Sequence, residues 1–200
     1  MTIENRGSER GFTLIEALAA SGIFAFVMVG ALSLFATNGG VYKSGQSKAE
    51  VQQNARIALE SAAREIRMAG YDHSGVIMGT LTNHTSIQVG NASSLTFVAD
   101  VTNDNTLDQV TYRISGTQFV RDFSSWNGTA FPTATTGVIA DGVSTLTFDY
   151  FTSTDAAIAT PVASGSLDSI KRVTVSLTTT HTSLDQQRTF PLVVDLRLRN

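Results

Sequence analysis

Cysteine is absent from this chain of 200 residues, and proline is scarce. Without cysteine the chain can form neither a disulfide framework nor a site that depends on a thiol. The prolines are Pro132, Pro161 and Pro191, so none interrupts the N-terminal half. A long helix in that half therefore meets no residue that removes a backbone hydrogen bond.

Charge and catalytic motifs are also sparse. Charged residues make up 16% of the chain and the formal net charge is −3, whereas a general nucleic-acid-binding protein would normally be basic. There is no H-x-x-x-H or H-E-x-x-H spacing, no P-loop and no G-x-S-x-G motif. We therefore expect no catalytic residue, no cofactor and no enzyme activity. The length predicts one domain plus an anchor, and abundant Ser, Thr and Gly favour an extracytoplasmic, β-rich domain.

The most distinctive stretch is Arg10–Ala36, in which R-G-F-T-L-I-E precedes a long apolar run. Between Ala17 and Ala36 the only polar side chains are Ser21 and Ser33. At a rise of about 1.5 Å per residue, about 20 apolar residues span the roughly 30 Å hydrocarbon core of a bilayer. The stretch therefore predicts a helix that crosses a membrane once.

Glu16 separates three interpretations of this stretch. A secretory signal peptide has a shorter apolar stretch of about 7–15 residues and a small-residue cleavage site, which is poor here. A plain anchor leaves the Glu16 carboxylate unexplained, because a charge at the start of an apolar run is costly without a partner. Cleavage of the Gly11–Phe12 bond would create an amine on Phe12, which could pair with the glutamate of a neighbouring copy in low dielectric.

The segment G-F-T-L-I-E followed by an apolar helix resembles the class III signal of type IV prepilins and type II secretion pseudopilins. In that family a membrane-embedded prepilin peptidase cuts after the glycine and N-methylates the phenylalanine, and the glutamate guides filament assembly. The resemblance puts processing at Gly11 and Phe12 and assembly at Glu16. It implies a leader at residues 1–11, a transmembrane helix half at 12–42, an amphipathic helix half at 43–70 and a β-rich head at 71–200.

The same resemblance implies a location and partners. The chain would cross the inner membrane once, with its N-terminus in the cytoplasm and its head in the periplasm, before joining a pilus or pseudopilus at the cell surface. Its partners would be other minor and major pilins or pseudopilins, the prepilin peptidase and the inner-membrane assembly platform. Nucleic acid is expected as a partner only if the filament takes up DNA.

Two features of the N-terminal helix refine this expectation. Many major pilins carry a proline within it, and the absence of one here favours a minor subunit. The adjacent Gly39 and Gly40 weaken a helix by about 1 kcal/mol each. They predict either an irregular point where the chain leaves the membrane or a hinge that bends during extraction.

Residues 43–69 have the pattern of the amphipathic half of the same helix, and Gly70 is a stop signal. One face is marked by residues that recur at steps of three and four, namely Val51, Ala55, Ala58, Ala62, Ile66 and Ala69. The ending resembles the R-x-I-R-x-A-G-Y stretch of PilW-like minor pilins, and J-type pseudopilins share parts of it. The matching residues are Arg64, Ile66, Arg67, Ala69, Gly70 and Tyr71.

Beyond Tyr71 the hydrophobic pattern changes to a period of two, which is typical of strands with one buried face. The predicted strands are Ser94–Ala99, Gln109–Ser115, Gln118–Phe123, Ser144–Phe151, Arg172–Thr178 and Arg188–Leu198. We expect one antiparallel sheet packed on the helix, which is an α+β pilin fold. Segments 124–137 and 152–169 are predicted loops, and Trp126 in the first either packs on the sheet or binds a partner.

The loop from Asp100 to Asp108 has two interpretations. Its alternating oxygen-bearing residues resemble the first positions of an EF-hand loop, but Thr111 stands where the bidentate glutamate is required. A weak calcium site is one interpretation, and a polar Asx-type turn between strands is the other. The candidate ligands are Asp100, Thr102, Asp104, Thr106 and Asp108.

Three functions remain open from the sequence. The first is a minor pilin that takes part in initiation or tip assembly of a type IV pilus. The second is a J-like minor pseudopilin of a type II secretion pseudopilus. The third is a binding module, in which the loops of the head make a tip adhesin or a DNA-uptake receptor.

Overall fold

The computed structural model describes residues 11–73, 85–183 and 186–198, and it has an α+β fold. By internal packing the chain divides into two compact units, Met1–Gln46 and Ser47–Asn200. Helix α1 (Leu14–Arg67) begins in the first unit and supplies the only helix of more than two turns in the described residues. All strands belong to the second unit, which we call the head.

Helix α1 continues through Gly39 and Gly40, so the predicted irregular point is wrong. Glycine lowers helix propensity but keeps its N–H group, so the pair does not interrupt the ladder of backbone hydrogen bonds. Whether this segment bends during extraction stays a prediction. At its other end α1 stops at Arg67, two residues before the predicted end. Gly70, with a φ of 84°, then turns the chain away, and its N–H donates to Val98 O at 2.8 Å.

The head contains two antiparallel sheets, whereas the sequence pattern predicts one. The first sheet has the order β1 (Ile87–Gly90), β2 (Ser94–Ala99), β3 (Asp108–Ser115), β4 (Gln118–Ser125) and β5 (Thr135–Asp141). The second has the order β7 (Ala157–Ile158), β6 (Val143–Phe151), β8 (Arg172–Ser183) and β9 (Gln186–Arg197). The chain changes sheet at Gly142, whose φ of 71° allows the sharp turn between β5 and β6.

The predicted strands are present, but strands β1, β5 and β7 and a 3-10 helix were not predicted. Strand β2 has the predicted bounds, and the others differ from the prediction by a few residues at their ends. Strand β5 occupies part of the predicted loop at 124–137. Strand β7 and helix η2 (Ser164–Ser169) occupy part of the predicted loop at 152–169.

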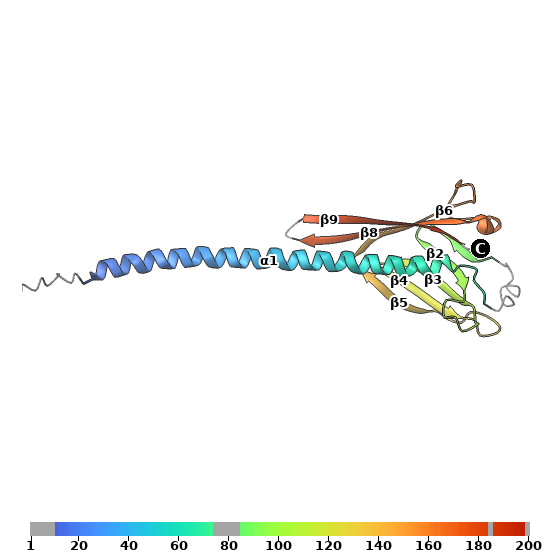
Figure 1. Cartoon of the computed structure of the whole chain (residues 1–200), viewed down its shortest axis with the longest axis horizontal. Coiled ribbons are helices and arrows are strands. Elements are labelled where there is room, and N and C mark those ends of the chain that lie inside the picture. The colour runs from blue at the N-terminus through green and yellow to red at the C-terminus, as the bar shows by residue number, and fades with distance from the viewer. Residues whose placement is uncertain (1–10, 74–84, 184–185, 199–200) are drawn as a thin grey trace, which may run out of the picture. The chain divides into compact units, whose positions relative to one another are not determined.

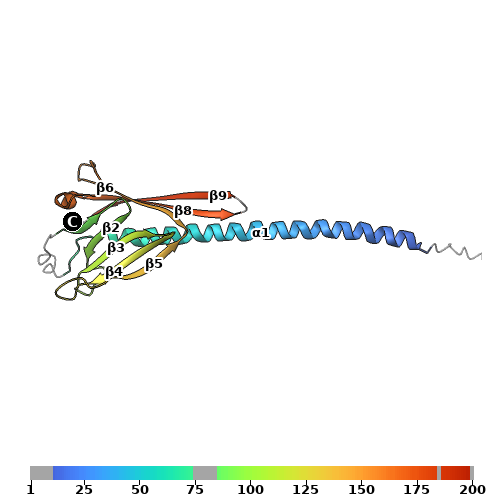
Figure 2. The ribbon, with the colours of Figure 1, turned by 180° about the vertical axis from the view of Figure 1, so that it is seen from behind.

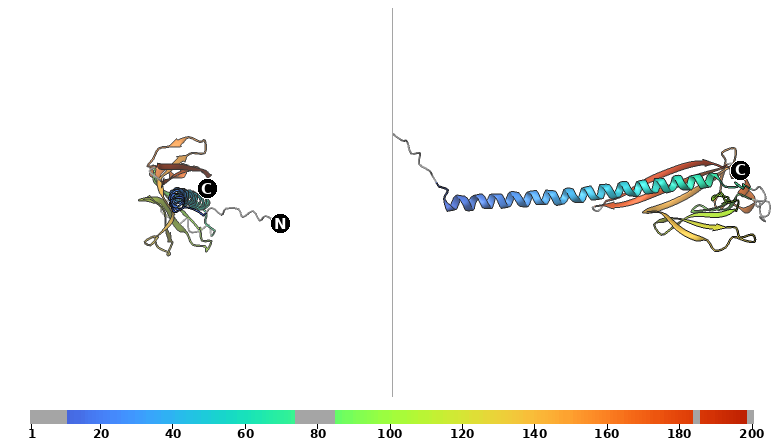
Figure 3. Two further views of the ribbon diagram at one scale, coloured as in Figure 1. Left: turned by 90° about the vertical axis from the view of Figure 1, so that its left-hand side faces the viewer. Right: turned by 60° about the horizontal axis from the view of Figure 1, so that its bottom comes forward.

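The core of the head lies where part of α1 meets both sheets, and strands lie on two sides of that part (Figures 1 and 3). Ala55, Ala62 and Ile66 of the predicted helix stripe are fully buried. They share one apolar cluster with residues of both sheets, among them Phe97 of β2 and Phe148 of β6. Alanine at these positions lets the helix backbone approach the strands closely, as dense packing requires.

A polar group joins α1 to the first sheet across this core. One oxygen of Glu65, Oε2, accepts hydrogen bonds from Tyr112 Oη and Arg121 Nε, both at 2.8 Å. Burial, followed by the nearby Glu65 carboxylate, raises the pKa of Tyr112 well above its ordinary value. The phenol therefore stays protonated and donates, so the contact fixes how the helix sits on β3 and β4.

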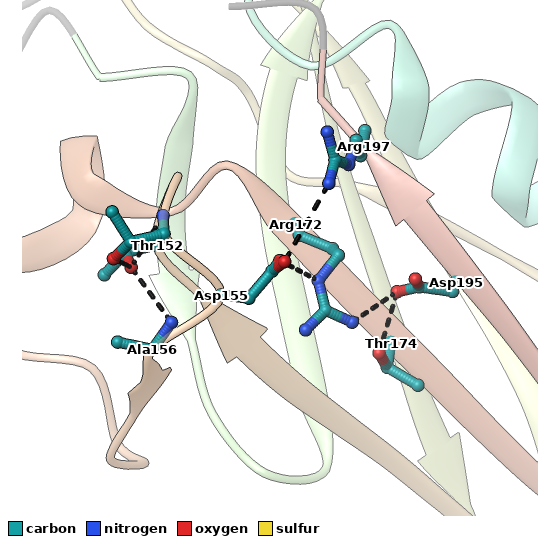
Figure 4. A network of polar contacts seen from close by, with 8 residues as sticks. Thr152, Asp155, Ala156, Arg172, Thr174, Asp195 and Arg197 are labelled. Carbon is teal, nitrogen blue, oxygen red and sulfur yellow. Dashed lines mark hydrogen bonds and ion pairs between the residues drawn. The ribbon is translucent and has the colours of Figure 1, made fainter.

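A second polar group ties β8 to β9 and to the turn before β7 (Figure 4). Arg172 on β8 contacts Asp155 through Nε at 2.9 Å and Asp195 of β9 through Nη1 at 3.0 Å. Thr174 also donates to Asp195, at 3.0 Å. The guanidinium lies 3.8 Å from the centroid of the Phe151 ring. These contacts hold the C-terminal part of β9 in register on β8.

Candidate functional site

The predicted cleavage site lies directly before α1. Gly11, Phe12 and Thr13 form no regular secondary structure, and the Phe12 side chain is 90% exposed. A Cβ atom built on Gly11 would meet no atom within 4 Å. The packing of this chain therefore does not require glycine at position 11. If glycine is needed there, the requirement comes from a partner that binds the segment.

Thr13 and Glu16 form a capping box at the start of α1. The Thr13 hydroxyl accepts a hydrogen bond from Glu16 N at 3.3 Å. In return, Glu16 Oε2 accepts from both Thr13 N and Thr13 Oγ1 at 3.1 Å. The reciprocal contacts satisfy backbone N–H groups that have no partner within a helix. This role was not predicted above, although the T-x-x-E spacing before an apolar run is the known signature of a capping box.

The capping box gives Glu16 a local function in addition to the predicted one. A carboxylate in the first helical turn is favoured by the helix dipole. Both contacts of the carboxylate with Thr13 use Oε2, so Oε1 can accept a hydrogen bond from another group. The geometry therefore allows Glu16 to cap its own helix and to accept a hydrogen bond from another group at the same time.

The following turns of α1 present a continuous apolar surface. Every large apolar side chain from Leu14 to Phe35 is exposed, and Phe26 and Phe35 are 81% and 78% exposed. The polar side chain of Ser21 in this stretch is satisfied by the helix itself, since its Oγ donates to Ala17 O at 2.7 Å. Among the described residues, α1 is the one helix long and apolar enough to cross a membrane. Apolar surface of this extent indicates contact with lipid or with other apolar helices.

The loop at 100–108 is built around two buried carboxylates that are already hydrogen-bonded. Asp100 accepts from the backbone N–H groups of Asp104 at 3.1 Å and Asn105 at 3.2 Å. Asp108 accepts from Thr102 N at 3.2 Å and Thr102 Oγ1 at 2.9 Å. It also accepts from the Ser125 hydroxyl. These contacts match the Asx-type turn, with Asp100 and Asp108 about as buried as core residues.

In this conformation the loop is held by hydrogen bonds within the chain, and calcium binding stays a prediction. No group of three or more His, Asp or Glu side chains in the described ranges is arranged to hold a metal. The two buried carboxylates already accept several hydrogen bonds from N–H and O–H groups, with which an ion would compete. Thr106 N also donates to Asp104 Oδ1 at 2.8 Å, so the exposed aspartate takes part in the same turn.

We expect excess calcium or a chelator to leave the melting temperature of the purified full-length chain unchanged, because the carboxylates are occupied. A ligand that bound only the folded state would raise it by mass action. Differential scanning fluorimetry in detergent measures the effect, with Asp104→Asn as the matched control. A calcium-dependent rise in the wild type that is lost in Asp104→Asn would show that the loop rearranges to bind the ion.

Trp126, the second candidate binding residue, is half-buried. Its ring packs edge-on against Phe131 of the same loop, with 5.1 Å between the ring centroids. Its backbone N–H donates to Leu107 O at 2.8 Å, which fixes the start of this loop against the residue that precedes β3. The aromatic pair therefore packs mainly within its own loop.

Comparison with known proteins points to the same N-terminal segment. The family described as the prokaryotic N-terminal methylation motif matches residues 6–32. A pilin-like protein of Thermus thermophilus, PilA3, is 32% identical over 62 residues, which cover 31% of this chain and 27% of that relative. The chain thus matches less than a third of the relative's length.

The fold is similar to that of a type IV-like pilin from Thermus thermophilus. The TM-score is 0.50 at 9% sequence identity, and the alignment covers 74% of this chain and 96% of that one. At this identity the likeness concerns the fold alone. Motif and fold together confirm the resemblance to type IV pilin-like proteins, and the α+β pilin fold predicted from the sequence is confirmed with it.

Proposed function

We propose that this chain is a minor pilin-like subunit that helps to start or cap a type IV pilus. Prepilin peptidase cuts between Gly11 and Phe12 and methylates the new Phe12 amine. The apolar part of α1 holds the subunit in the inner membrane, with the head on the periplasmic side. The subunit then enters the filament from the membrane through the assembly platform, beside other pilins.

One observation carries the proposal. The methylation motif at residues 6–32 coincides with an exposed, non-helical Gly11–Phe12 bond directly before a capped apolar helix. A peptidase needs an extended segment that it can bind, and this segment ends where the helix begins. The packing of the chain does not require glycine at position 11. Recognition by the peptidase would explain why glycine is there.

Two further observations support a minor, structural role. Helix α1 contains no proline, in contrast to many major pilins. The sequence relative and the fold neighbour are both pilin-like, which favours a structural protein over an enzyme.

Replacing Gly11 by valine tests the proposal. We expect Gly11→Val to leave the full-length precursor in the inner membrane, because a branched side chain next to the scissile bond obstructs the peptidase. Intact-mass spectrometry of the membrane fraction distinguishes precursor from processed chain. Gly22→Ala is the control, because a Cβ atom at Gly22 also meets nothing within 4 Å.

In the wild type we expect the filament fraction to contain chains that start at N-methylated Phe12. Assembled chains that still start at Met1 would overturn the proposal. Normal processing of Gly11→Val would show that the cut lies elsewhere.

A further inference from the structure

The head has an open strand edge on each of its two sheets. Among the described residues, β5 at the end of the first sheet and β9 at the end of the second each pair with one strand. Strand β9 pairs with β8 from Gln186 to Arg197 without a bulge. Neither strand contains lysine, and the bulge in β5 and the proline in β9, which also protect an edge, leave residues 135–138 and 192–197 uninterrupted. These two segments are able to pair with another strand.

Each of these edges carries an exposed valine. Val138 on β5 is 51% exposed and Val193 on β9 is 62% exposed. Val193 faces away from the core, because its neighbours Leu192 and Val194 pack against the core. Gly137 is paired with Arg121, whose side chain reaches α1, so Val138 next to it also faces away. Both valines therefore lie on the outer faces of their sheets.

The two edges run in opposite directions along α1 within the head. Strand β5 starts near Glu65, since Gly137 is paired with the arginine that binds this residue. Just after β5, a Cβ atom on Gly142 would lie 3.3 Å from Val51 Cγ1, so the strand runs toward earlier turns of the helix. Strand β9 starts near Lys48, whose Nζ lies 4.6 Å from the Phe190 ring centroid, and runs toward later turns (Figures 1 and 2).

Two interruptions set the register in which these edges match. In β5 the pairing with β4 shifts at Ile139, which forms a bulge after Val138. In β9, Pro191 lacks the N–H group that a ladder needs. When β5 and β9 are placed antiparallel, Ile139 and Pro191 both lie beyond the same end of the segment that can pair. Residues 135–138 then face residues 193–196, with Val138 opposite Val193.

We propose that β5 of one copy of this chain pairs in antiparallel fashion with β9 of a second copy whose α1 runs parallel to its own. The contact joins the first sheet of one head to the second sheet of the next. Val138 of the first copy and Val193 of the second form a cross-strand apolar pair. Thr136 of the first copy lies opposite Asp195 of the second. In its own copy Asp195 is held by Arg172 and Thr174, so the edge is preorganised (Figure 4).

This contact is heterologous, because the two copies contribute different strands to it, β5 from one and β9 from the other. Such contacts propagate and do not close into a dimer. The inference rests on the proposed function, since it requires subunits with parallel helices. It adds that copies of this chain stand side by side in the assembly.

The absence of cysteine allows a direct test by disulfide trapping. Two full-length forms with different tags are co-expressed in the producing strain, one with Val138→Cys and the other with Val193→Cys. Cα atoms of directly opposed strand residues are about 4.5–5.5 Å apart, within the range of a disulfide. We expect mild oxidation to yield severalfold more of the mixed-tag disulfide than either variant yields alone. The control pairs Val89→Cys, an exposed valine on the edge strand β1, with Val193→Cys.

The same samples are assayed for a Phe12 start and for incorporation into filaments. Processed, incorporated chains without the mixed disulfide would overturn the paired edges and leave the proposed function standing. Symmetric disulfides from one variant alone, or an equal yield in the Val89→Cys control, would also overturn the inference. A failure of processing would count against the proposed function, whereas a mixed disulfide in that material would still support the contact.

Discussion

Replacing Ala62 by leucine is expected to destabilise the head strongly. Ala62 is fully buried on the face of α1 that contacts the core. Three additional carbon atoms have no space between the helix and the strands, so the helix must move outward or side chains must leave their preferred rotamers. Overpacking of this kind costs about 1–3 kcal/mol. Outward movement would also strain the contact of Glu65 with Tyr112 and Arg121, which fixes the helix on the first sheet.

The single tryptophan makes this prediction measurable in the full-length chain. Trp126 belongs to the head, so its fluorescence reports unfolding of the head alone. For a domain of this size about 1 kcal/mol corresponds to a shift of about 2–4 °C in melting temperature. Ala49→Leu, the same change at an exposed position of α1, should shift stability by no more than about 0.5 kcal/mol. Equal effects of the two substitutions would show that close helix packing does not stabilise the head.

The helix stripe illustrates what sequence periodicity predicts well. Steps of three and four residues selected Ala55, Ala58, Ala62, Ile66 and Ala69, and all five are buried. Val51, at the edge of the head, is half-buried. The pattern works because a helix that packs on a core must place its apolar residues on one side, whatever covers them.

Strand β5 illustrates what periodicity cannot detect. Its first four residues are all exposed, so no alternation of buried and exposed positions marks the segment. It is a strand because β4 offers it hydrogen-bond partners from Gln118 to Phe123. The number of sheets was mispredicted for a related reason, since a period of two identifies the buried face of a strand and not its neighbours.

The long-range polar contacts of Glu65 could not be predicted from the sequence, whereas the local contact between Thr13 and Glu16 could. Glu65 lies 47 residues from Tyr112 and 56 from Arg121, and no spacing rule connects residues at such distances. Thr13 and Glu16 are three residues apart, and the capping-box signature predicts their contact. Gly11, Phe12 and Glu16 stay predictions as processing and assembly residues, since their roles depend on partners outside the chain.

The capping box makes it possible to separate two roles of Glu16. If the proposed function holds, apolar helix segments pack together out of water in the filament, and the Phe12 amine that cleavage would release could supply a cation to the Glu16 of a neighbouring subunit. Breaking a buried ion pair by removing one partner costs about 3–5 kcal/mol. Loss of a helix cap costs about 1 kcal/mol. The charge should therefore matter more for assembly than the cap.

Glu16→Gln removes the charge but keeps an oxygen that accepts hydrogen bonds from Thr13, since glutamine also serves in a capping box. Thr13→Ala removes the cap hydroxyl and keeps the charge. We expect both variants to insert and to be cleaved, because neither step needs the ion pair. Glu16→Gln should then join filaments about as poorly as Glu16→Ala, whereas Thr13→Ala should assemble nearly normally. Because a subunit that starts a filament acts early, the number of pili should fall more than their length, as counted by electron microscopy with processing checked by blot.

If Glu16→Gln assembled normally while Glu16→Ala did not, the helix cap and not the negative charge would be the feature that assembly requires.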